Sequence, residues 1–381
     1  MVHYSPLHGH RIPPPPSTAG PSHTASQPHP SSKSPCLTSN SMAGELSIQS
    51  ILANARKPST VKLYARKWQL FLTFATSSSL PTYPTTLDAL LQFLLSLFRK
   101  GLSISTLRVY IAAVVYHQPT GSEGSHLFKH PTLKLFLQGL RNTRPHHCPP
   151  TPQWSLNIVL QAHKGRPFEP MATAPLLLLS LKTCFLIAIT SARRASELAA
   201  LRMDPPFLQF YPDKVTLFPD ITFLPKVVSE FHINQPIILP TFFPAPTTDL
   251  ERSLHLLDVR RALLFYLSRT APVRKTKRLF VRTVDPQKGE PVSSQAISKW
   301  ICNTITLAYL TKGCALPSPP KGHSTRAVAF STAFLRGIPI PDICKAATWA
   351  APSTFANHYR MDVRARADTA FGRAVLSSAL Q

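Results

Sequence analysis

The sequence predicts a mainly α fold with a small antiparallel β-sheet, divided between two domains. Three observations predict it. Apolar residues recur at spacings of three and four from about residue 46 onward, which is typical of amphipathic helices. Short strand-like runs gather between residues 206 and 239, and a proline-rich stretch at 145–153 separates the helical regions. The length of 381 residues and the hydrophobic content of 44% suffice for two buried cores.

Residues 1–45 are predicted to form a disordered arm. They are rich in Pro, Ser, Thr and His, include the run Pro13 to Pro16, and offer few apolar side chains to offset the entropy of ordering. No apolar core of a secretory signal follows Met1. An alternative that coexists with any enzymatic role is a proline-rich scaffold that binds folded partners.

A helical domain is predicted over residues 46–144. Helices are expected over 59–72, 87–98, 105–115 and 132–140, the first with Ser59 as its N-cap. Basic side chains decorate these helices: Lys62, Arg66, Lys67, Arg99, Lys100, Arg108 and Lys134. Two interpretations remain equally open from this pattern, an ordinary bundle with solvated charges and a DNA-binding module.

Residues 145–153 are predicted to be a linker because four of them are proline. His146, His147 and Cys148 have metal-binding side chains, but adjacent residues rarely point at one ion, so no metal site is predicted. Six scattered cysteines without a CxxC pair indicate a reducing compartment.

The second domain is predicted over residues 154–381. Its most apolar run, Leu176 to Ile189, contains Lys182 and falls short of the roughly 20 residues of a membrane span, so a buried helix is expected. Strands are expected at 206–210, 214–218 and 237–239, and helices at 250–269, 293–310, 324–335 and 342–347.

The charge balance predicts a polyanionic partner. Lys and Arg number 42 against 17 Asp and Glu, which gives a net charge of +25 and a pI near 10.3. Nucleic acid is the expected partner, and an anionic membrane surface is the alternative. No P-loop and no acidic metal cluster is present in the sequence, so no cofactor or metal is predicted.

Three motifs in the second domain combine residues suited to phosphate chemistry. The first is Arg193-Arg194 at the end of the apolar run, with Glu197 one helical turn after Arg194 and able to orient it. A buried ion pair is the alternative interpretation of this motif alone.

The second motif is His323-Ser324-Thr325-Arg326, at the start of an apolar helix whose amides can add donors for an anion. The third runs from Trp349 to Tyr359. A tyrosine attacks phosphorus well only when arginines neutralise the phosphate, so Tyr359 as a packed aromatic is the alternative.

The order of these motifs after a basic helical module resembles the tyrosine recombinase/integrase family over about residues 46–375. Finer motifs look like the recombinases of DIRS-type eukaryotic retrotransposons. These motifs are residues 190–194, 223–226, 323–326, 347–349 and 355–359. The resemblance implies that a core-binding (SAM-like) domain and a catalytic domain clamp DNA. It also implies a site-specific recombinase that integrates a mobile element, acting as a tetramer on two duplexes in the nucleus.

The resemblance also implies roles for individual residues. Catalytic roles fall to Arg194, Lys226, His323, Arg326 and Trp349, with Tyr359 as the nucleophile and no metal. Lys214 is the rival of Lys226 as the general acid. Residues expected to contact DNA are Lys62, Arg66, Lys67, Arg108 and Arg193.

One departure and three alternatives accompany the resemblance. Trp349 and Tyr359 are ten residues apart, where nine is the commoner family spacing, which leaves the position of Trp349 open. For the whole protein, the alternatives are a catalytically inactive, domesticated DNA-binding protein of the same fold and a type IB topoisomerase. For the basic run at residues 274–278, a nuclear signal, a phosphate contact and a solvated loop all remain open.

Overall fold

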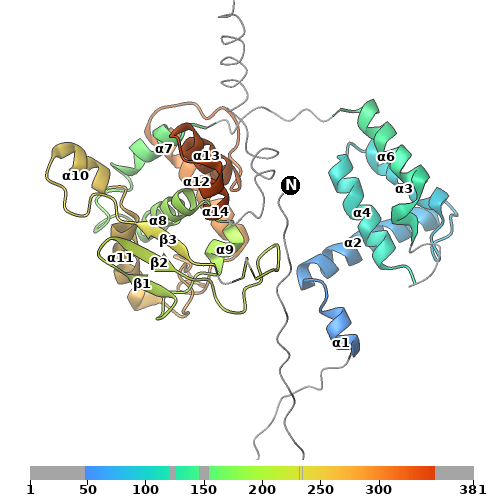
Figure 1. The fold of residues 1–381 in the computed structure, drawn as a ribbon, viewed down its shortest axis with the longest axis horizontal. Coiled ribbons are helices and arrows are strands. Elements are labelled where there is room, and N and C mark those ends of the chain that lie inside the picture. Colours follow the sequence, from blue (N-terminus) through green and yellow to red (C-terminus); the bar gives the residue numbers. More distant parts are fainter. Residues whose placement is uncertain (1–47, 120–125, 146–153, 231, 234, 348–381) are drawn as a thin grey trace, which may run out of the picture. The chain divides into compact units, whose positions relative to one another are not determined.

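The chain divides into two compact units, residues 1–146 and residues 147–381 (Figure 1). The computed structural model describes residues 48–119, 126–145, 154–230, 232–233 and 235–347. The predicted arm, most of the predicted linker with His146, His147 and Cys148, and the segment with Trp349 and Tyr359 lie outside these described residues.

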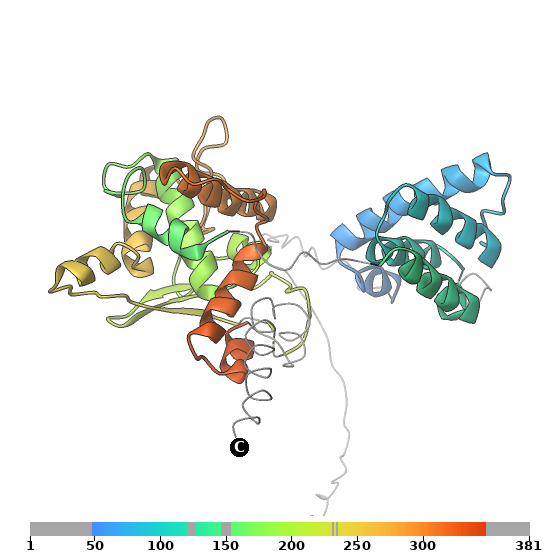
Figure 2. The same ribbon diagram turned by 90° about the horizontal axis from the view of Figure 1, so that it is seen from above.

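The first unit is a helical bundle (Figure 2). Its elements are α1 (Ile48–Ala53), α2 (Pro58–Ser77), α3 (Leu87–Arg99), α4 (Ile104–Tyr116), the 3-10 turn η1 (Leu127–Lys129) and α6 (Pro131–Thr143). All four predicted helices are present. The core forms where α2, α3 and α4 meet, and there the rings of Phe71 and Tyr110 each contact the ring of Phe93 edge to face.

The ends of these helices follow ordinary capping chemistry, with one correction. The Thr86 side chain accepts a hydrogen bond from the Ala89 amide at the start of α3, and Ser103 does the same for α4. The prediction that Ser59 caps α2 is wrong. Pro58 is the first helical residue, because its fixed φ and missing N–H suit that position, and Lys57 precedes it.

The second unit is built around α8 (Leu176–Ser191), which contacts β3, α11, α12 and α13 (Figure 1). Twelve of its sixteen residues are buried, as its apolar character on all sides predicts. The helices around it are α7 (Leu156–His163), α9 (Ala195–Ala199), α10 (Asp249–His255), α11 (Val259–Thr270), η2 (Ala271–Val273), α12 (Ser294–Thr311), α13 (Ser324–Leu335) and α14 (Ile340–Ala346).

The sheet is three-stranded and antiparallel, in the order β1-β2-β3, which confirms the predicted sheet. Its strands are β1 (Leu208–Phe210), β2 (Lys214–Leu217) and β3 (Ile237–Pro240). Leu217 of β2 pairs with Leu208 on one side and Ile237 on the other, and all three are buried. The inner face of the sheet therefore belongs to the core that surrounds α8.

One predicted helix is divided into two. The apolar pattern over residues 250–269 suggested a single helix, but α10 ends at His255 and α11 begins at Val259. Asp258 separates them because its buried carboxylate accepts the backbone N–H groups of Arg261 and Phe242. This capping chemistry starts a new helix that the apolar period alone does not reveal.

A lysine is accommodated in the middle of α8 by a buried ion-pair cluster. The Lys182 ammonium lies 2.6 Å from Glu169 Oε1 and 2.8 Å from the carbonyl oxygen of His163, and Arg261 Nη1 lies 2.7 Å from the same carboxylate oxygen. Burial lowers the pKa of Lys182 to about 8, although Glu169 opposes the shift. None of the helices in the described parts of the chain is long and apolar enough to cross a membrane.

Candidate active site

The two adjacent arginines lie at the junction of α8 and α9. Ala192 ends α8 in the left-handed conformation, with φ of 49°, and Arg194 is the N-cap residue of α9. The sharp turn at Ala192 carries the chain out of the buried helix immediately before the arginines. The Arg194 side chain is 33% exposed, so its charge faces a region that solvent or a ligand can enter.

Glu197 holds both arginines. Its Oε1 lies 3.0 Å from Arg194 Nη1 and its Oε2 lies 3.5 Å from Arg193 Nη1. The pairing of Glu197 with Arg194, expected from their spacing, is therefore confirmed. A buried carboxylate that pairs with two guanidinium groups fixes their orientation before any ligand arrives.

Arg193 differs from Arg194 in its surroundings. Its side chain is 10% exposed, and its Nη2 donates to the carbonyl oxygen of Pro236 at 3.0 Å, at the start of β3. Burial lowers the pKa of Arg193, and Glu197 opposes that shift. Arg193 thus ties the α8–α9 turn to the sheet, and little of its guanidinium lies at the surface.

Arg326 joins the second motif to the first. Its side chain leaves the first turn of α13, its Nη1 donates to the carbonyl oxygen of Ala192, and its guanidinium carbon lies 5.3 Å from the centroid of the Phe330 ring. Arg326 is only 3% exposed. This hydrogen bond connects two motifs that are more than 130 residues apart in the sequence.

His323 lies at the N-cap position of α13 and is exposed. The predicted apolar helix after it is confirmed as α13. His323 and Arg326 differ in exposure, because His323 precedes the first residue of α13 and is exposed whereas Arg326 is buried. The histidine is accessible to a ligand, and the arginine is held within the fold.

The two candidate lysines occupy different places near the sheet. Lys226 is exposed and lies in the connection between β2 and β3, outside both strands. Lys214 is the first residue of β2, opposite Pro240, and its Nζ lies 5.3 Å from the centroid of the Tyr211 ring. Lys226 is therefore exposed outside the strands, whereas Lys214 is half-buried within the sheet.

The described chain ends beside the arginine turn. Ala347, which follows α14, is fully buried in a small cluster with Ala192, Phe330, Ile343 and Cys344. Trp349 and Tyr359, which the sequence places in the third motif, lie outside the described residues. The structure thus bonds Arg326 to Ala192, two residues before Arg194.

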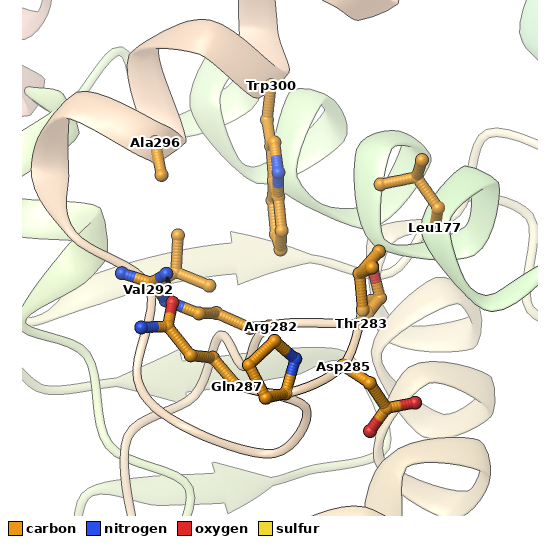
Figure 3. Close-up of a pocket in the computed structure, with 10 residues that line it drawn as sticks. Leu177, Arg282, Thr283, Asp285, Gln287, Val292, Ala296 and Trp300 are labelled. Atoms are coloured by element: carbon orange, nitrogen blue, oxygen red, sulfur yellow. Dashed lines mark hydrogen bonds between the residues drawn. The ribbon is translucent and has the colours of Figure 1, made fainter.

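This unit contains several cavities. One, of about 590 Å³, borders the arginine turn at Ser191 and Ala192, and mostly apolar side chains from α7, α8, α13, α14 and the segment between β3 and α11 line it. Another, of about 330 Å³, lies between the loop at Arg282–Gln287 and α12, where Trp300 extends toward the loop (Figure 3). A third, of about 250 Å³, lies beside Asp258 and Arg261. Across the described part of the chain, no three His, Cys, Asp or Glu side chains are close enough to hold a metal ion.

The basic run at residues 274–278 is largely structural. Arg274 donates to the carbonyl oxygens of Arg278 and Leu279 at 2.8 Å, and Arg278 donates to that of Ala200 at 2.8 Å. Lys275 and Lys277 are exposed. The run therefore exposes two of its four basic side chains, and the other two bind backbone carbonyl oxygens of the fold.

The cations expected to bind DNA in the first unit are mostly at its surface. Lys62 and Arg66 are exposed one turn apart on α2, and Arg108 is exposed on α4. Lys67 is half-buried, with its ammonium 3.5 Å from the centroid of the Tyr110 ring, and burial together with Arg66 lowers its pKa. Asp88 is the sole carboxylate among the described residues of this unit, and it accepts a hydrogen bond from Gln92.

Two backbone groups of the site escape prediction from the sequence. The carbonyl oxygens of Ala192 and Pro236 hold Arg326 and Arg193. A left-handed alanine carries no sequence signal, because this conformation is usually taken by glycine. The arginines themselves were identifiable because charged side chains next to a buried helix require partners.

Comparison with solved structures identifies the fold. No protein-family model and no curated protein sequence matches the chain. The integrase of the Tn1549 transposon, in complex with a circular intermediate DNA, matches with a TM-score of 0.50 and 14% identity over 82% of this chain and 92% of that one. The chain has the tyrosine recombinase fold.

Two further structures match less closely. The XerH recombinase, bound to a palindromic difH substrate after cleavage, matches with a TM-score of 0.48 and 12% identity over 81% of this chain and 78% of that one. A lambda integrase tetramer bound to a Holliday junction matches with a TM-score of 0.45 and 14% identity over 80% and 74% of the two chains.

Proposed function

We propose that this protein is a DNA recombinase that cleaves and rejoins strands through a 3′-phosphotyrosine at Tyr359. The observation that carries the proposal is the junction at Ala192. There Arg326 of the His-Ser-Thr-Arg motif bonds to the turn that presents Arg194, within a fold shared with a transposon integrase. Two arginines connected through this turn, with an exposed histidine three residues before Arg326, are suited to binding one phosphodiester.

The proposed reaction exchanges one ester bond for another. The Tyr359 oxygen attacks phosphorus, the bond from phosphorus to the 5′ oxygen breaks, and the phosphate remains attached to tyrosine. His323 assists removal of the tyrosine proton, and Lys226 supplies a proton to the departing 5′ oxygen. Reversal by another 5′ hydroxyl restores a phosphodiester without ATP, because the covalent intermediate conserves the bond energy.

The arginines have different tasks in this mechanism. Arg194, the more exposed, meets the non-bridging oxygens, while Glu197 fixes its direction. Arg326 is held by Ala192 and adds a second positive charge from inside the fold, where a lower dielectric strengthens its effect. Arg193 is assigned to positioning, because Glu197 and Pro236 occupy its guanidinium.

The position of Ala347 supports a role for the third motif. Trp349 is two residues beyond Ala347, and two residues span at most about 7 Å. The short chain distance from the buried Ala347 supports the proposed role of the Trp349 indole N–H as a phosphate donor. The chain from Ala347 to Tyr359 is long enough to bring the phenol to the same phosphate.

Nicked suicide-substrate DNA tests the proposal directly. The wild-type protein is expected to form an SDS-resistant protein–DNA adduct, and Tyr359→Phe is expected to abolish it while DNA binding persists. Tyr211→Phe is the matched control, because this tyrosine is exposed near the sheet and serves no proposed chemistry. DNA binding by wild type without any adduct would instead support the catalytically inactive, domesticated DNA-binding protein.

The finer assignment is also part of the proposal. We assign the enzyme to a mobile element of the DIRS retrotransposon type, acting in the nucleus as a tetramer on two duplexes with the two units clamping the DNA. The motif sequences at residues 190–194 and 323–326 support this assignment. A plasmid relaxation assay separates it from a type IB topoisomerase, which relaxes supercoils as a monomer.

A further inference from the structure

Trp154, the first described residue of the second unit, is bonded to the His-Ser-Thr-Arg motif. Its indole Nε1 donates to Ser324 Oγ at 2.9 Å, and Ser324 Oγ donates onward to the carbonyl oxygen of Lys321 at 2.6 Å. Trp154 is 7% exposed, and its ring contacts Phe185 of α8 edge to face. The donor of this hydrogen bond is buried and its acceptor is half-buried, so its loss is expected to be costly.

The first turn of α13 depends on such external support. Its N-cap residue, His323, makes no side-chain hydrogen bond to the helix amides, so the usual capping interaction is missing. From the other side, Gly322 lies so close to α12 that a β-carbon there would be 2.1 Å from Ser298 Oγ and 3.0 Å from Ser298 Cα. The turn that carries His323 and Arg326 is therefore fixed between Trp154 and α12.

We propose that Trp154 is a positioning residue of the site, acting through Ser324 to fix His323 and Arg326 relative to Arg194. This inference rests on the proposed function for its catalytic consequence. Loss of the indole N–H frees Ser324 to rotate and loosens the first turn of α13. Arg326 is bonded to Ala192 from that same turn, and His323 lies at its start. Both side chains would then lose their fixed position relative to the phosphate.

Trp154→Phe separates the hydrogen bond from packing, because phenylalanine keeps a ring against Phe185 but has no N–H donor. At saturating nicked DNA, the rate of adduct formation is expected to fall about three- to tenfold, which is the usual consequence of losing one hydrogen bond. The dissociation constant for DNA should stay within about twofold. Equal losses in rate and affinity, or no loss in rate, would overturn the proposal.

Variants at the partner sharpen the test. Ser324→Ala removes the acceptor and is expected to match Trp154→Phe. The double variant should be no slower than either single one, because both changes break the same bond. Ser324→Thr retains a hydroxyl and should restore most of the rate. Independent, multiplying effects of the two single substitutions would contradict the proposed link.

Trp300→Phe is the matched control. Trp300 is a half-buried tryptophan of the same unit. Its ring packs against Phe280 and extends toward the loop at Arg282–Gln287 (Figure 3), and its N–H has no hydrogen-bond partner within the described residues. The rate of adduct formation should be unchanged in this variant. A loss equal to that of Trp154→Phe would mean that any tryptophan replacement disturbs the unit.

Hydrogen–deuterium exchange provides a readout that does not require catalysis. In Trp154→Phe the amides of residues 324–327 are expected to exchange faster, while those in the middle of α12 remain as in wild type. If exchange is faster in Trp154→Phe but the wild-type protein forms no adduct, the proposed function is refuted, whereas the link between Trp154 and the first turn of α13 still holds. Unchanged exchange would overturn the inference, even if wild type is an active recombinase.

Discussion

The two units use the same basic residue types in opposite ways. In the first unit, Lys62, Arg66 and Arg108 are exposed, and the described residues include a single carboxylate, Asp88. In the second unit, Lys182 and Arg326 are buried and Arg193 is only 10% exposed, and each is bonded to a carboxylate or a backbone carbonyl oxygen. The net charge of +25 therefore combines charges available to a distant polyanion with charges that are used to build the fold.

This difference predicts different consequences of removing charge. Exposed cations in high dielectric contribute little to folding and remain free to contact phosphates. Buried cations are costly without a partner, so their removal, or the removal of their partner, affects the fold first.

Replacement of Glu169 is expected to have the largest effect on stability. Burial alone raises the pKa of this carboxyl, but hydrogen bonds from Arg261 and Lys182 outweigh burial and leave the pKa below its ordinary value. Glu169→Ala strands Lys182, which is fully buried, and should lower the free energy of unfolding by about 3–5 kcal/mol. Urea denaturation of the second unit measures the loss.

An exposed pair of similar length provides the control. Asp249 and Arg252 are 2.7 Å apart, against 2.6 Å for Glu169 and Lys182, but the Asp249 side chain is 97% exposed. Asp249→Ala should therefore cost no more than about 1 kcal/mol. Equal losses in the two variants would show that burial does not separate the two kinds of charge.

His163 is expected to give the second unit an acid-sensitive stability. Burial lowers its pKa from 6.5 to about 3, and the ring is stacked between Phe168 and Phe185. Between these pH values the unfolded chain binds a proton on this ring that the folded chain does not. The free energy of unfolding therefore falls as the pH falls below 6.5, by about 1.4 kcal/mol per pH unit from this group.

His163→Phe removes the titrating group and keeps an aromatic ring in the stack. Stability measured with urea between pH 7 and pH 5 should therefore fall less steeply in the variant than in wild type. The comparison concerns the slope, so a constant loss from the missing hydrogen bond between His163 and Val159 does not affect it. Parallel pH curves for the two proteins would show that this histidine is not the source of the acid sensitivity.

The sequence predicted the helices and the sheet because both depend on local periodicity. It also predicted Glu197 as the partner of Arg194, since residues three apart on a helix meet. It did not predict the break before Val259, where a capping carboxylate overrides the apolar pattern. Nor did it predict that Ala192 and Trp154 support the second motif, because these contacts join residues more than 130 positions apart.

The exposed cations of the first unit should produce the smallest effect on folding and a distinct effect on binding. Lys62→Gln, Arg66→Gln and Arg108→Gln should each change the free energy of unfolding by less than about 0.5 kcal/mol. If each side chain contacts a phosphate, each loss lowers the slope of log affinity against log salt by about 0.9.

Lys67→Gln is the contrasting variant on α2. Its ammonium lies over Tyr110, so it should lower stability with little change in the salt slope. If Lys67→Gln changes the salt slope strongly and the three exposed variants do not, DNA contacts the surface at Lys67, where α2 packs against α4, and not the exposed cations.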